Sequence, residues 1–230
     1  MKKMKFSVVL LSALIILSGC GMNNTTKGGL LGAGGGAALG ALAGKLIGGS
    51  GKSTAIGAAI GTAVGTTAGV LIGKKMDKAK AEAAAIANAQ VESVTDANGL
   101  QAVQVTFDSG ILFATNKAEL NSSAKASLKE FADVLKNYTD ADVAIVGHTD
   151  NTGSDAINNP LSLKRAQSVE SYLKSCGVTA DQITSVDGKG SKEPVADNGT
   201  AAGRTQNRRV EVFMYASQEM IDAANAGTLK

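Results

Sequence analysis

The stretch that decides the fold reads Gly147-His148-Thr149-Asp150-Asn151-Thr152-Gly153. It follows the short apolar run Val143-Ala144-Ile145-Val146. An apolar run of this length that ends in a cluster of Asn, Thr and Gly is typical of a strand followed by a turn. We therefore expect His148 to Asp150 to emerge from the C-terminal end of a strand into a loop.

A helix is predicted a few residues later, within Asn158-x-x-Leu161-Ser162-x-x-Arg165-Ala166-x-x-Val169-x-x-x-Leu173. Ser162 is a candidate N-cap, the apolar residues recur at helical spacing, and Gly177 supplies a C-terminal stop. This places Arg165 in the first turn, where a carboxylate would meet its guanidinium and free backbone N–H groups. Asp150, from the neighbouring loop, could bind an ammonium group. The two stretches together predict a site for a zwitterion.

These motifs resemble the OmpA-like C-terminal domain, a family that holds peptidoglycan non-covalently in the periplasm of diderm bacteria. The likeness runs from about residue 103 to about residue 212. It includes Leu112-Phe113-Ala114-Thr115-Asn116-Lys117 and the paired arginines of Asn207-Arg208-Arg209-Val210-Glu211-Val212. The resemblance implies recognition of diaminopimelate in the peptide stem, because the side-chain end of that residue carries both a carboxylate and an ammonium.

By position, the resemblance implies that Asp150 and Arg165 are the principal ligands, with Asn116, Arg208 and Thr149 beside them. The chain departs from many members at the residue after the phenylalanine, where it has alanine in place of an acid. Each charged candidate also has a purely structural alternative. Asp150 could cap its own turn, Arg165 could be an exposed helix arginine, and Arg208 could be an edge-strand charge that blunts association.

His148 is the only histidine in the chain, and its proximity to Asp150 raises the possibility of a metal or an acid–base site. A metal site needs three or four convergent ligands, and the sequence has neither a second histidine nor a cluster of cysteines. A serine or cysteine nucleophile would need this same histidine as its base, and no Gly-x-Ser-x-Gly motif is present. We expect a binding protein without metal or cofactor, and not an enzyme.

The N-terminus predicts export and lipid anchoring. Residues 1–19 combine three lysines, an apolar core of about a dozen residues and the small-residue sequence Leu17-Ser18-Gly19 before Cys20. This pattern resembles a bacterial lipobox, which implies cleavage before Cys20, covalent lipid on its thiol and a lipidated tether over residues 20–27. Two or three acyl chains anchor a protein stably. We expect an outer-membrane lipoprotein with its C-terminal domain in the periplasm, and a reduced Cys176 in the core.

Removal of residues 1–19 would take three of the 23 basic residues and leave 20 against 20 acidic residues. This balance favours neither nucleic acid nor a polybasic membrane patch as a partner.

Residues 28–73 contain an internal repeat in which glycine recurs every four residues, from Gly28 to Gly48 and again from Gly57 to Gly73. A row of glycines lets two helices approach closely in a membrane. The segment resembles a glycine-zipper and is predicted to be a hairpin of two membrane helices. Two alternatives remain open, a flexible linker and self-association into a homo-oligomer through the same faces.

Residues 74–99 are rich in Ala, Lys and Glu in their first part and are predicted to be a helical linker. Residues 100–216 are predicted to form the OmpA-like domain, an α+β fold of the order βαβαββ with two helices on one face of a mixed sheet. Residues 217–230 are expected to be a tail that contains a short amphipathic helix.

The predicted function is a static tether. Lipid and the zipper segment would hold the outer membrane, and the domain would bind the diaminopimelate of the wall. Many such weak bonds along the wall would together hold it firmly, by avidity. The alternative is an oligomerising membrane-active or envelope-assembly protein whose wall-binding domain only positions the zipper.

Overall fold

The computed structural model describes residues 64–96, 98–114 and 116–230. The predicted signal peptide, the lipidation site Cys20, the tether and residues 28–63 of the zipper lie outside the described residues. In the part of the chain that is described, no helix has the length and apolar character needed to cross a membrane.

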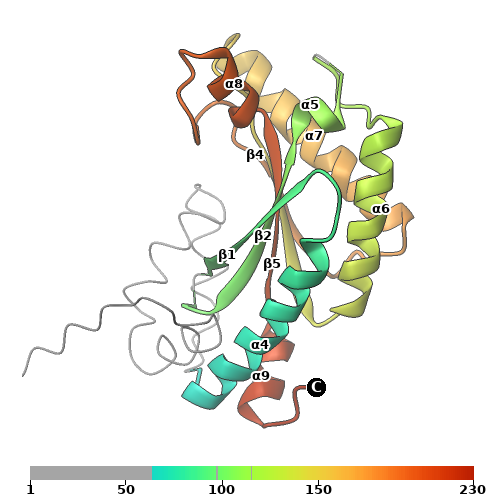
Figure 1. Ribbon diagram of the computed structural model, residues 1–230, viewed down its shortest axis with the longest axis vertical. Helices are drawn as coiled ribbons and strands as arrows, with labels where there is room; N and C mark the ends of the chain where they lie inside the picture. Colours follow the sequence, from blue (N-terminus) through green and yellow to red (C-terminus); the bar gives the residue numbers. More distant parts are fainter. Residues whose placement is uncertain (1–63, 97, 115) are drawn as a thin grey trace, which may run out of the picture.

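The described residues fold into a mixture of helices and strands (Figure 1). Their bounds are α4 Thr66–Ala83, β1 Ala89–Thr95, β2 Gln101–Asp108, α5 Ser109–Leu112, α6 Ser122–Asn137, β3 Ala141–Gly147, α7 Asp155–Ser175, β4 Ile183–Gly188, α8 Ala201–Asn207, β5 Arg209–Ala216 and α9 Gln218–Asn225.

The five strands form one mixed sheet in the order β1-β2-β5-β3-β4. Only β3 and β4 run parallel, and α7 makes the crossover connection that a parallel pair requires. The last strand, β5, lies between β2 and β3 and is antiparallel to both. The predicted α+β fold of the order βαβαββ is therefore confirmed from β2 onward, with the short helices α5 and α8 added at the loops.

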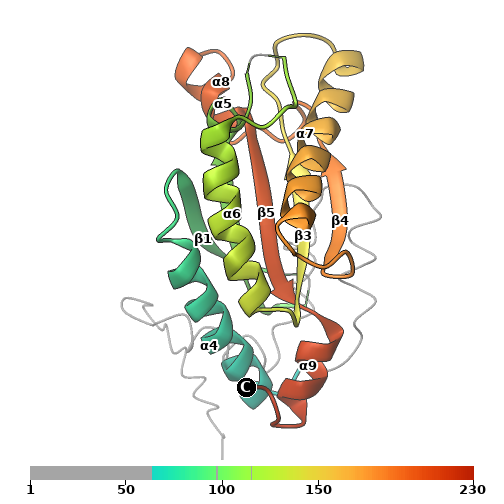
Figure 2. The same ribbon diagram turned by 90° about the vertical axis from the view of Figure 1, so that its right-hand side faces the viewer.

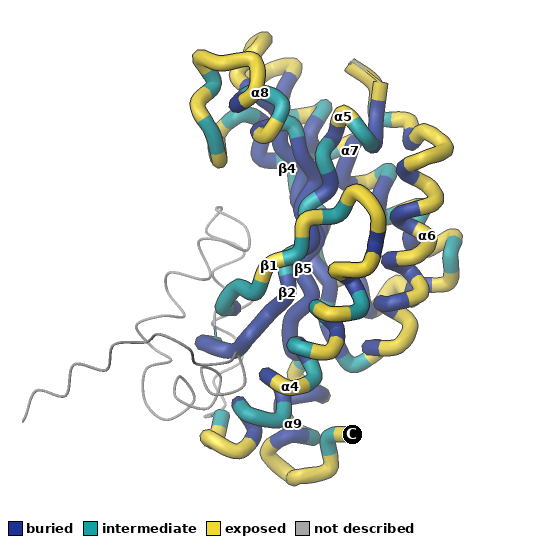
Figure 3. Tube along the Cα trace, viewed as in Figure 1, coloured by how far each residue is buried: buried dark blue, intermediate teal, exposed yellow. Residues whose placement is uncertain are grey.

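Helices α6 and α7 lie on the same face of the sheet, as the two views in Figures 1 and 2 show. The apolar residues that recur at helical spacing in α6, Ala124, Leu128, Phe131 and Leu135, are all fully buried. Phe131 packs edge-on against Phe107 of β2, with 5.9 Å between ring centroids. The inner strands β2, β5 and β3 are mostly buried, and in Figure 3 the exposed residues lie mainly on outer helix faces and loops.

The start of α7 differs from the prediction. The helix begins at Asp155 and not just after Ser162, and it continues through Pro160. Ser162 is therefore no N-cap. Its hydroxyl donates to the Asn159 carbonyl and accepts from the Gly190 backbone N–H, 2.9 Å in each case, and so joins α7 to the loop after β4. As a consequence Arg165 lies well inside the helix, and the free N–H groups of the helix N-terminus are not beside it.

The predicted helical linker over residues 74–99 is also corrected. The helix α4 starts at Thr66 and buries Ile72, Met76, Ala79 and Ala83 completely, because these residues form one apolar helix face. Residues 89–95 are a strand that pairs with β2 along its whole length. The folded domain thus begins near residue 64, and residues 66–73 of the predicted zipper belong to it.

The predicted helix in the tail is present as α9. It buries Met220, Ile221 and Ala224 and packs against α4. The Gly65 backbone N–H at the start of α4 donates to the Asn225 side chain over 3.3 Å. The tail helix therefore packs between α4 and the end of β5.

Candidate functional site

The predicted ligand-binding residues meet in one groove at the end of the sheet where β3 ends and β5 begins. This end carries α5, α8 and the start of α7, and it lies opposite the end that carries α9 and the start of α4 (Figure 1). The groove has a volume of about 730 Å³. Its lining residues are Ser109, Gly110, Phe113, Ala114, Asn116, Thr149, Asp150, Thr152, Asn158, Leu161, Arg165, Arg204 and Arg208. All five residues implied by the resemblance are among them.

Asp150 is buried and uses both carboxylate oxygens. Oδ1 accepts a hydrogen bond from the Thr152 backbone N–H at 2.8 Å, and Oδ2 accepts one from Arg208 Nη1 at 2.7 Å. Burial alone would raise the pKa of Asp150, but the hydrogen bonds from Arg208 and Thr152 outweigh it and hold that pKa below its usual value. The carboxylate is therefore kept ionised. It does cap its own turn, as the structural alternative proposed, and it also faces the groove.

Arg165 is only 4% exposed and is held by three contacts. Nε donates to the Lys117 carbonyl at 3.1 Å, Nη1 donates to Ser109 Oγ at 3.2 Å, and the guanidinium carbon lies 5.2 Å from the centre of the Phe113 ring. Burial and the nearby Arg208 lower the pKa of Arg165, although an arginine stays protonated. Among the described residues, Nη2 has no hydrogen-bond partner. Arg165 is thus a rigid cation with one free donor group, and it is not an exposed helix arginine.

The paired arginines have opposite surroundings. Arg208 lines the groove, where its Nη2 also donates to Thr205 Oγ1 at 2.9 Å. Arg209 is the first residue of β5 and is buried away from the groove, with Nε donating to Glu211 Oε1 at 2.7 Å. The resemblance implied Arg208 as a ligand residue, and of the two arginines it is the one that lines the groove.

Asn116 and Thr149 complete the predicted set. Asn116 is exposed and has a positive φ of 56°, a conformation that asparagine tolerates better than most residues. The backbone N–H of Thr149 donates to the Gly190 carbonyl at 2.9 Å. Its buried hydroxyl has no hydrogen-bond partner among the described residues. An unsatisfied hydroxyl beside the groove is a candidate contact for a ligand.

Sequence reasoning missed several lining residues. Phe113 and Asn158 lie inside the quoted motifs, and Asn158 Nδ2 donates to the Asp150 carbonyl at 3.3 Å, which fixes the loop that carries the acid. Arg204 carries a third guanidinium into the groove and donates from Nη1 to the Asn198 carbonyl at 2.9 Å. No sequence signal identified Arg204, because it belongs to α8, a short helix that was not predicted.

His148 lies beside the site without entering the groove. Its ring is buried, and Nε2 is 3.3 Å from Glu211 Oε2. Burial alone would raise the pKa of Glu211, but His148 and Arg209 together lower it. Within the described ranges, no three side chains of the metal-binding types converge. This histidine contacts the buried ion pair that fixes the first residues of β5.

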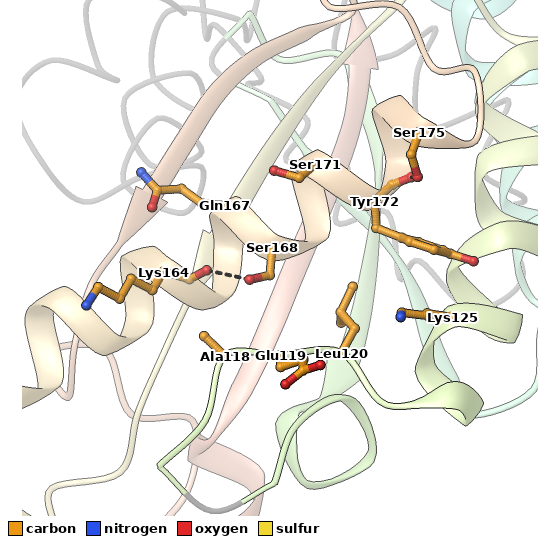
Figure 4. Close-up of a pocket in the computed structure, with 10 residues that line it drawn as sticks. All are labelled: Ala118, Glu119, Leu120, Lys125, Lys164, Gln167, Ser168, Ser171, Tyr172 and Ser175. Atoms are coloured by element: carbon orange, nitrogen blue, oxygen red, sulfur yellow. Dashed lines mark hydrogen bonds between the residues drawn. The ribbon is translucent and has the colours of Figure 1, made fainter.

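A second depression, of about 660 Å³, lies between α7 and the segment that leads into α6 (Figure 4). Figure 4 shows Lys164, Ser168 and Tyr172 along one side, with Glu119 and Lys125 opposite. The Ser168 hydroxyl is bonded to the carbonyl of Lys164 in its own helix at 3.0 Å. None of the predicted ligand residues lines this depression, so we place the candidate site in the groove at Asp150.

Comparison with known proteins finds two family matches in this chain. Residues 112–208 match the model of the OmpA family, and residues 1–77 match the YMGG-like Gly-zipper model. Both segments predicted from the sequence, an OmpA-like domain and a glycine-zipper segment, therefore have a matching family model.

Among curated relatives, the peptidoglycan-binding protein ArfA of Mycobacterium tuberculosis is 47% identical over 104 residues, which are 45% of this chain and 32% of ArfA. The outer-membrane lipoprotein YfiB of Pseudomonas aeruginosa is 40% identical over 108 residues, 47% of this chain and 64% of YfiB. This chain thus spans about a third of the length of the first of these relatives.

Among solved structures, the cell wall anchor of the T6SS from Pseudomonas aeruginosa is similar with a TM-score of 0.52 and 29% identity. The match covers 62% of this chain and 97% of that chain. The likeness extends over nearly all of the anchor, in agreement with the fold described above.

Proposed function

We propose that this chain is a non-enzymatic outer-membrane lipoprotein that binds peptidoglycan non-covalently through the diaminopimelate of the stem peptide. The observation that carries the proposal is that a buried carboxylate, Asp150, shares one groove with the guanidinium groups of Arg165 and Arg208. A ligand end that carries both an ammonium and a carboxylate complements these charges. The names of ArfA and YfiB support binding to peptidoglycan and an outer-membrane location, respectively.

The two charges of such a ligand would have distinct partners. The free Nη2 of Arg165 can donate to the ligand carboxylate, and a charge-assisted bond of this kind contributes about 1.5–3 kcal/mol. The carboxylate of Asp150 keeps lone pairs beyond the two hydrogen bonds it accepts, and these can receive an ammonium. A lysine-containing stem lacks the carboxylate and would lose the first contact.

The tether would be completed at the other end of the chain. Lipid on Cys20 would anchor the protein in the outer membrane, and the domain would lie in the periplasm. The match of residues 1–77 to a glycine-zipper model favours a second candidate function, an oligomerising envelope-assembly protein in which the wall-binding domain only positions the zipper. Cross-linking of the full chain in membranes that captures closed oligomers would favour this alternative.

The direct test is pulldown of the full-length protein, in non-ionic detergent, with purified sacculi. Arg165→Lys keeps the charge but removes the planar fork, and Asp150→Asn keeps the shape but removes the charge. We expect both to reduce binding at least tenfold. Lys164→Ala is the matched control, because this lysine is adjacent in sequence but lines the depression of Figure 4. It should bind like the wild type.

Titration with stem peptides then tests the specificity. A diaminopimelate-containing peptide should bind roughly tenfold or more tightly than its lysine-containing counterpart, which corresponds to the loss of about 1.4 kcal/mol or more. Equal binding of the two peptides by a protein shown to be folded would refute recognition of diaminopimelate.

A further inference from the structure

A basic groove lies at the end of the domain opposite the candidate ligand site. Its volume is about 390 Å³, and it runs along α4 beside the last residues of the chain. The residues that line it are Leu71, Lys74, Lys75, Lys78, Glu82, Asn137, Tyr138, Leu229 and Lys230. The sequence analysis did not predict this patch, because Lys230 comes beside the α4 lysines only in the folded chain.

The acidic side chains near this groove, Asp140 and Glu82, each accept a hydrogen bond, and Asp140 also forms an ion pair. Asp140 Oδ2 accepts from Lys75 Nζ at 2.6 Å, and Lys75 also donates to the Lys230 carbonyl at 3.1 Å. Glu82 Oε1 accepts from the Tyr138 hydroxyl at 2.9 Å. Burial and this bond raise the pKa of Tyr138, so its phenol stays a neutral donor.

Three lysines remain without an acidic partner. Within the described ranges, no ion pair joins Lys74, Lys78 or Lys230 to an acid. Lys74 and Lys78 are four residues apart on one helix face, and like charges at this spacing destabilise a helix by about 0.2–0.5 kcal/mol. A bound anion would remove this repulsion.

The groove is also amphipathic. Leu71 precedes the lysines on the same side of α4, and Leu229 lines the groove next to Lys230. The opposite side of α4 is buried in the core through Ile72 and Met76. Lysines flanked by leucines suit a membrane surface, where cations meet headgroups and apolar side chains reach the acyl boundary.

The place of the groove in the fold points to the same surface. The chain enters the domain at the start of α4, after the segment that carries Cys20. Figures 1 and 2 show the start of α4, α9 and the C-terminal end together at one end of the domain, with α5, α8 and the start of α7 at the other. The lysine groove therefore lies at the end of the domain where the segment from Cys20 enters, and the candidate ligand site lies at the opposite end.

We propose that this lysine groove binds the phosphate groups of anionic phospholipid headgroups in the membrane to which the chain is anchored. This inference rests on the proposed lipid anchor but does not depend on the ligand of the Asp150 groove. Basic residues next to an anionic membrane are attracted to it within about one Debye length, and the attraction is lost at high salt.

The test uses the full-length lipidated protein reconstituted in vesicles of phosphatidylcholine, with or without phosphatidylglycerol. Amine-reactive labelling followed by mass spectrometry measures the exposure of each lysine. We expect phosphatidylglycerol to slow the labelling of Lys74, Lys78 and Lys230 several-fold and to leave Lys125 and Lys164, which line the depression of Figure 4, unchanged. At about 1 M salt, where the Debye length is roughly 3 Å, the protection should disappear.

A charge-reversal pair tests the groove itself. Lys74→Glu with Lys78→Glu should abolish the protection of Lys230 by phosphatidylglycerol. The matched control is Lys125→Glu with Lys129→Glu, which has the same spacing and charge change on the exposed side of α6. It should keep the protection. Equal labelling of Lys230 in both lipid mixtures would overturn the proposal.

Two further readouts separate the possible failures. Soluble glycerol phosphate, added without vesicles, should not protect the three lysines at millimolar concentration. Protection by it would replace the membrane with a free phosphate ester as the ligand. Sacculus pulldown of the Lys74→Glu, Lys78→Glu protein should match the wild type. If the wild type failed to bind sacculi but its three lysines were still protected by phosphatidylglycerol, only the wall-binding function would be refuted.

Discussion

Arg208 Nη1 donates a hydrogen bond to Asp150 Oδ2 over 2.7 Å, so the acid predicted to bind a ligand already has a cationic partner. The pair lies beside Arg165 in one groove that also contains Arg204. The groove therefore holds one carboxylate and three guanidinium groups and carries a net positive charge. An incoming carboxylate is attracted by this excess, and an incoming ammonium shares Asp150 with Arg208.

The first prediction concerns the pKa of Asp150. Arg208→Ala removes the partner that opposes the effect of burial, so the pKa of Asp150 should rise above its value in the wild type. Titration followed by carboxyl-carbon NMR measures this rise. Arg204→Ala is the control, because Arg204 lines the same groove but bonds to Asn198, and it should shift the pKa much less.

The Arg208→Ala variant should also change how the free energy of unfolding depends on pH. The folded-state pKa of Asp150 is below its unfolded value, which is near 3.9 for an aspartate. The stabilisation from this group is therefore present above about pH 4 and is lost as the pH falls through the lower, folded-state pKa. Arg208→Ala should be less stable than the wild type at pH 7, and the gap should narrow below pH 4. A constant gap would contradict this assignment.

The second prediction concerns the close approach of β3 and α7. A Cβ at Gly147 would overlap the carbonyl oxygen of Ser162, which is backbone and cannot turn aside. Gly147→Ala should therefore push α7 away from the sheet and destabilise the domain by at least about 3 kcal/mol. It should also weaken sacculus binding, because Arg165 moves with the helix.

Chemical denaturation provides the measurement for Gly147→Ala. Gly65→Ala is the control, because its new Cβ would meet only the Asn225 side chain at 3.8 Å. It should change stability by less than about 1 kcal/mol. A Gly147→Ala protein as stable as this control would show that the helix can shift freely.

The third prediction tests whether α4 belongs to the folded domain. Met76 is completely buried, so Met76→Ala should lower the free energy of unfolding by about 2–5 kcal/mol. Lys74→Ala, two residues away and exposed, should change it by about 0.5 kcal/mol or less. If α4 were only a spacer, as the sequence suggested, the two variants would be equally stable.

The fourth prediction concerns the buried charges behind the groove. Glu211→Gln removes the partner of the Arg209 guanidinium, which is 5% exposed, and should cost about 3–5 kcal/mol in stability. Glu219→Gln, an exposed change of the same kind on α9, should be nearly neutral. Thermal unfolding of both proteins distinguishes a buried ion pair from a surface charge.

The sequence by itself determined the features that depend on neighbours along the chain. The strand before Asp150 and the apolar face of α6 follow from periodicity. The Asn121 cap, whose side chain accepts from the Ala124 N–H at 2.8 Å, and the stop at Gly177, with φ of 97°, follow from local chemistry. These signals act within a turn or a strand, so they can be read without knowing the fold.

The motifs also indicated which residues gather at the groove, but not how they pair. Asp150 and Arg208 are 58 residues apart, and nothing near either residue shows that they bond to each other. The sequence placed Arg165 in the first turn of the helix because Ser162 resembles an N-cap. In the structure α7 begins earlier, and the Ser162 hydroxyl instead accepts a hydrogen bond from the loop after β4.

Only the tertiary structure decided the role of the segments on either side of the predicted domain. Ile72 and Met76 belong to a glycine- and lysine-rich segment that looked like a membrane hairpin and a spacer, yet both are fully buried against the sheet. Lys230 comes beside Lys74 and Lys78 because α9 turns the chain back onto α4. Such contacts are set by the order of strands in the sheet and by which helix face finds an apolar partner, and no local pattern encodes either.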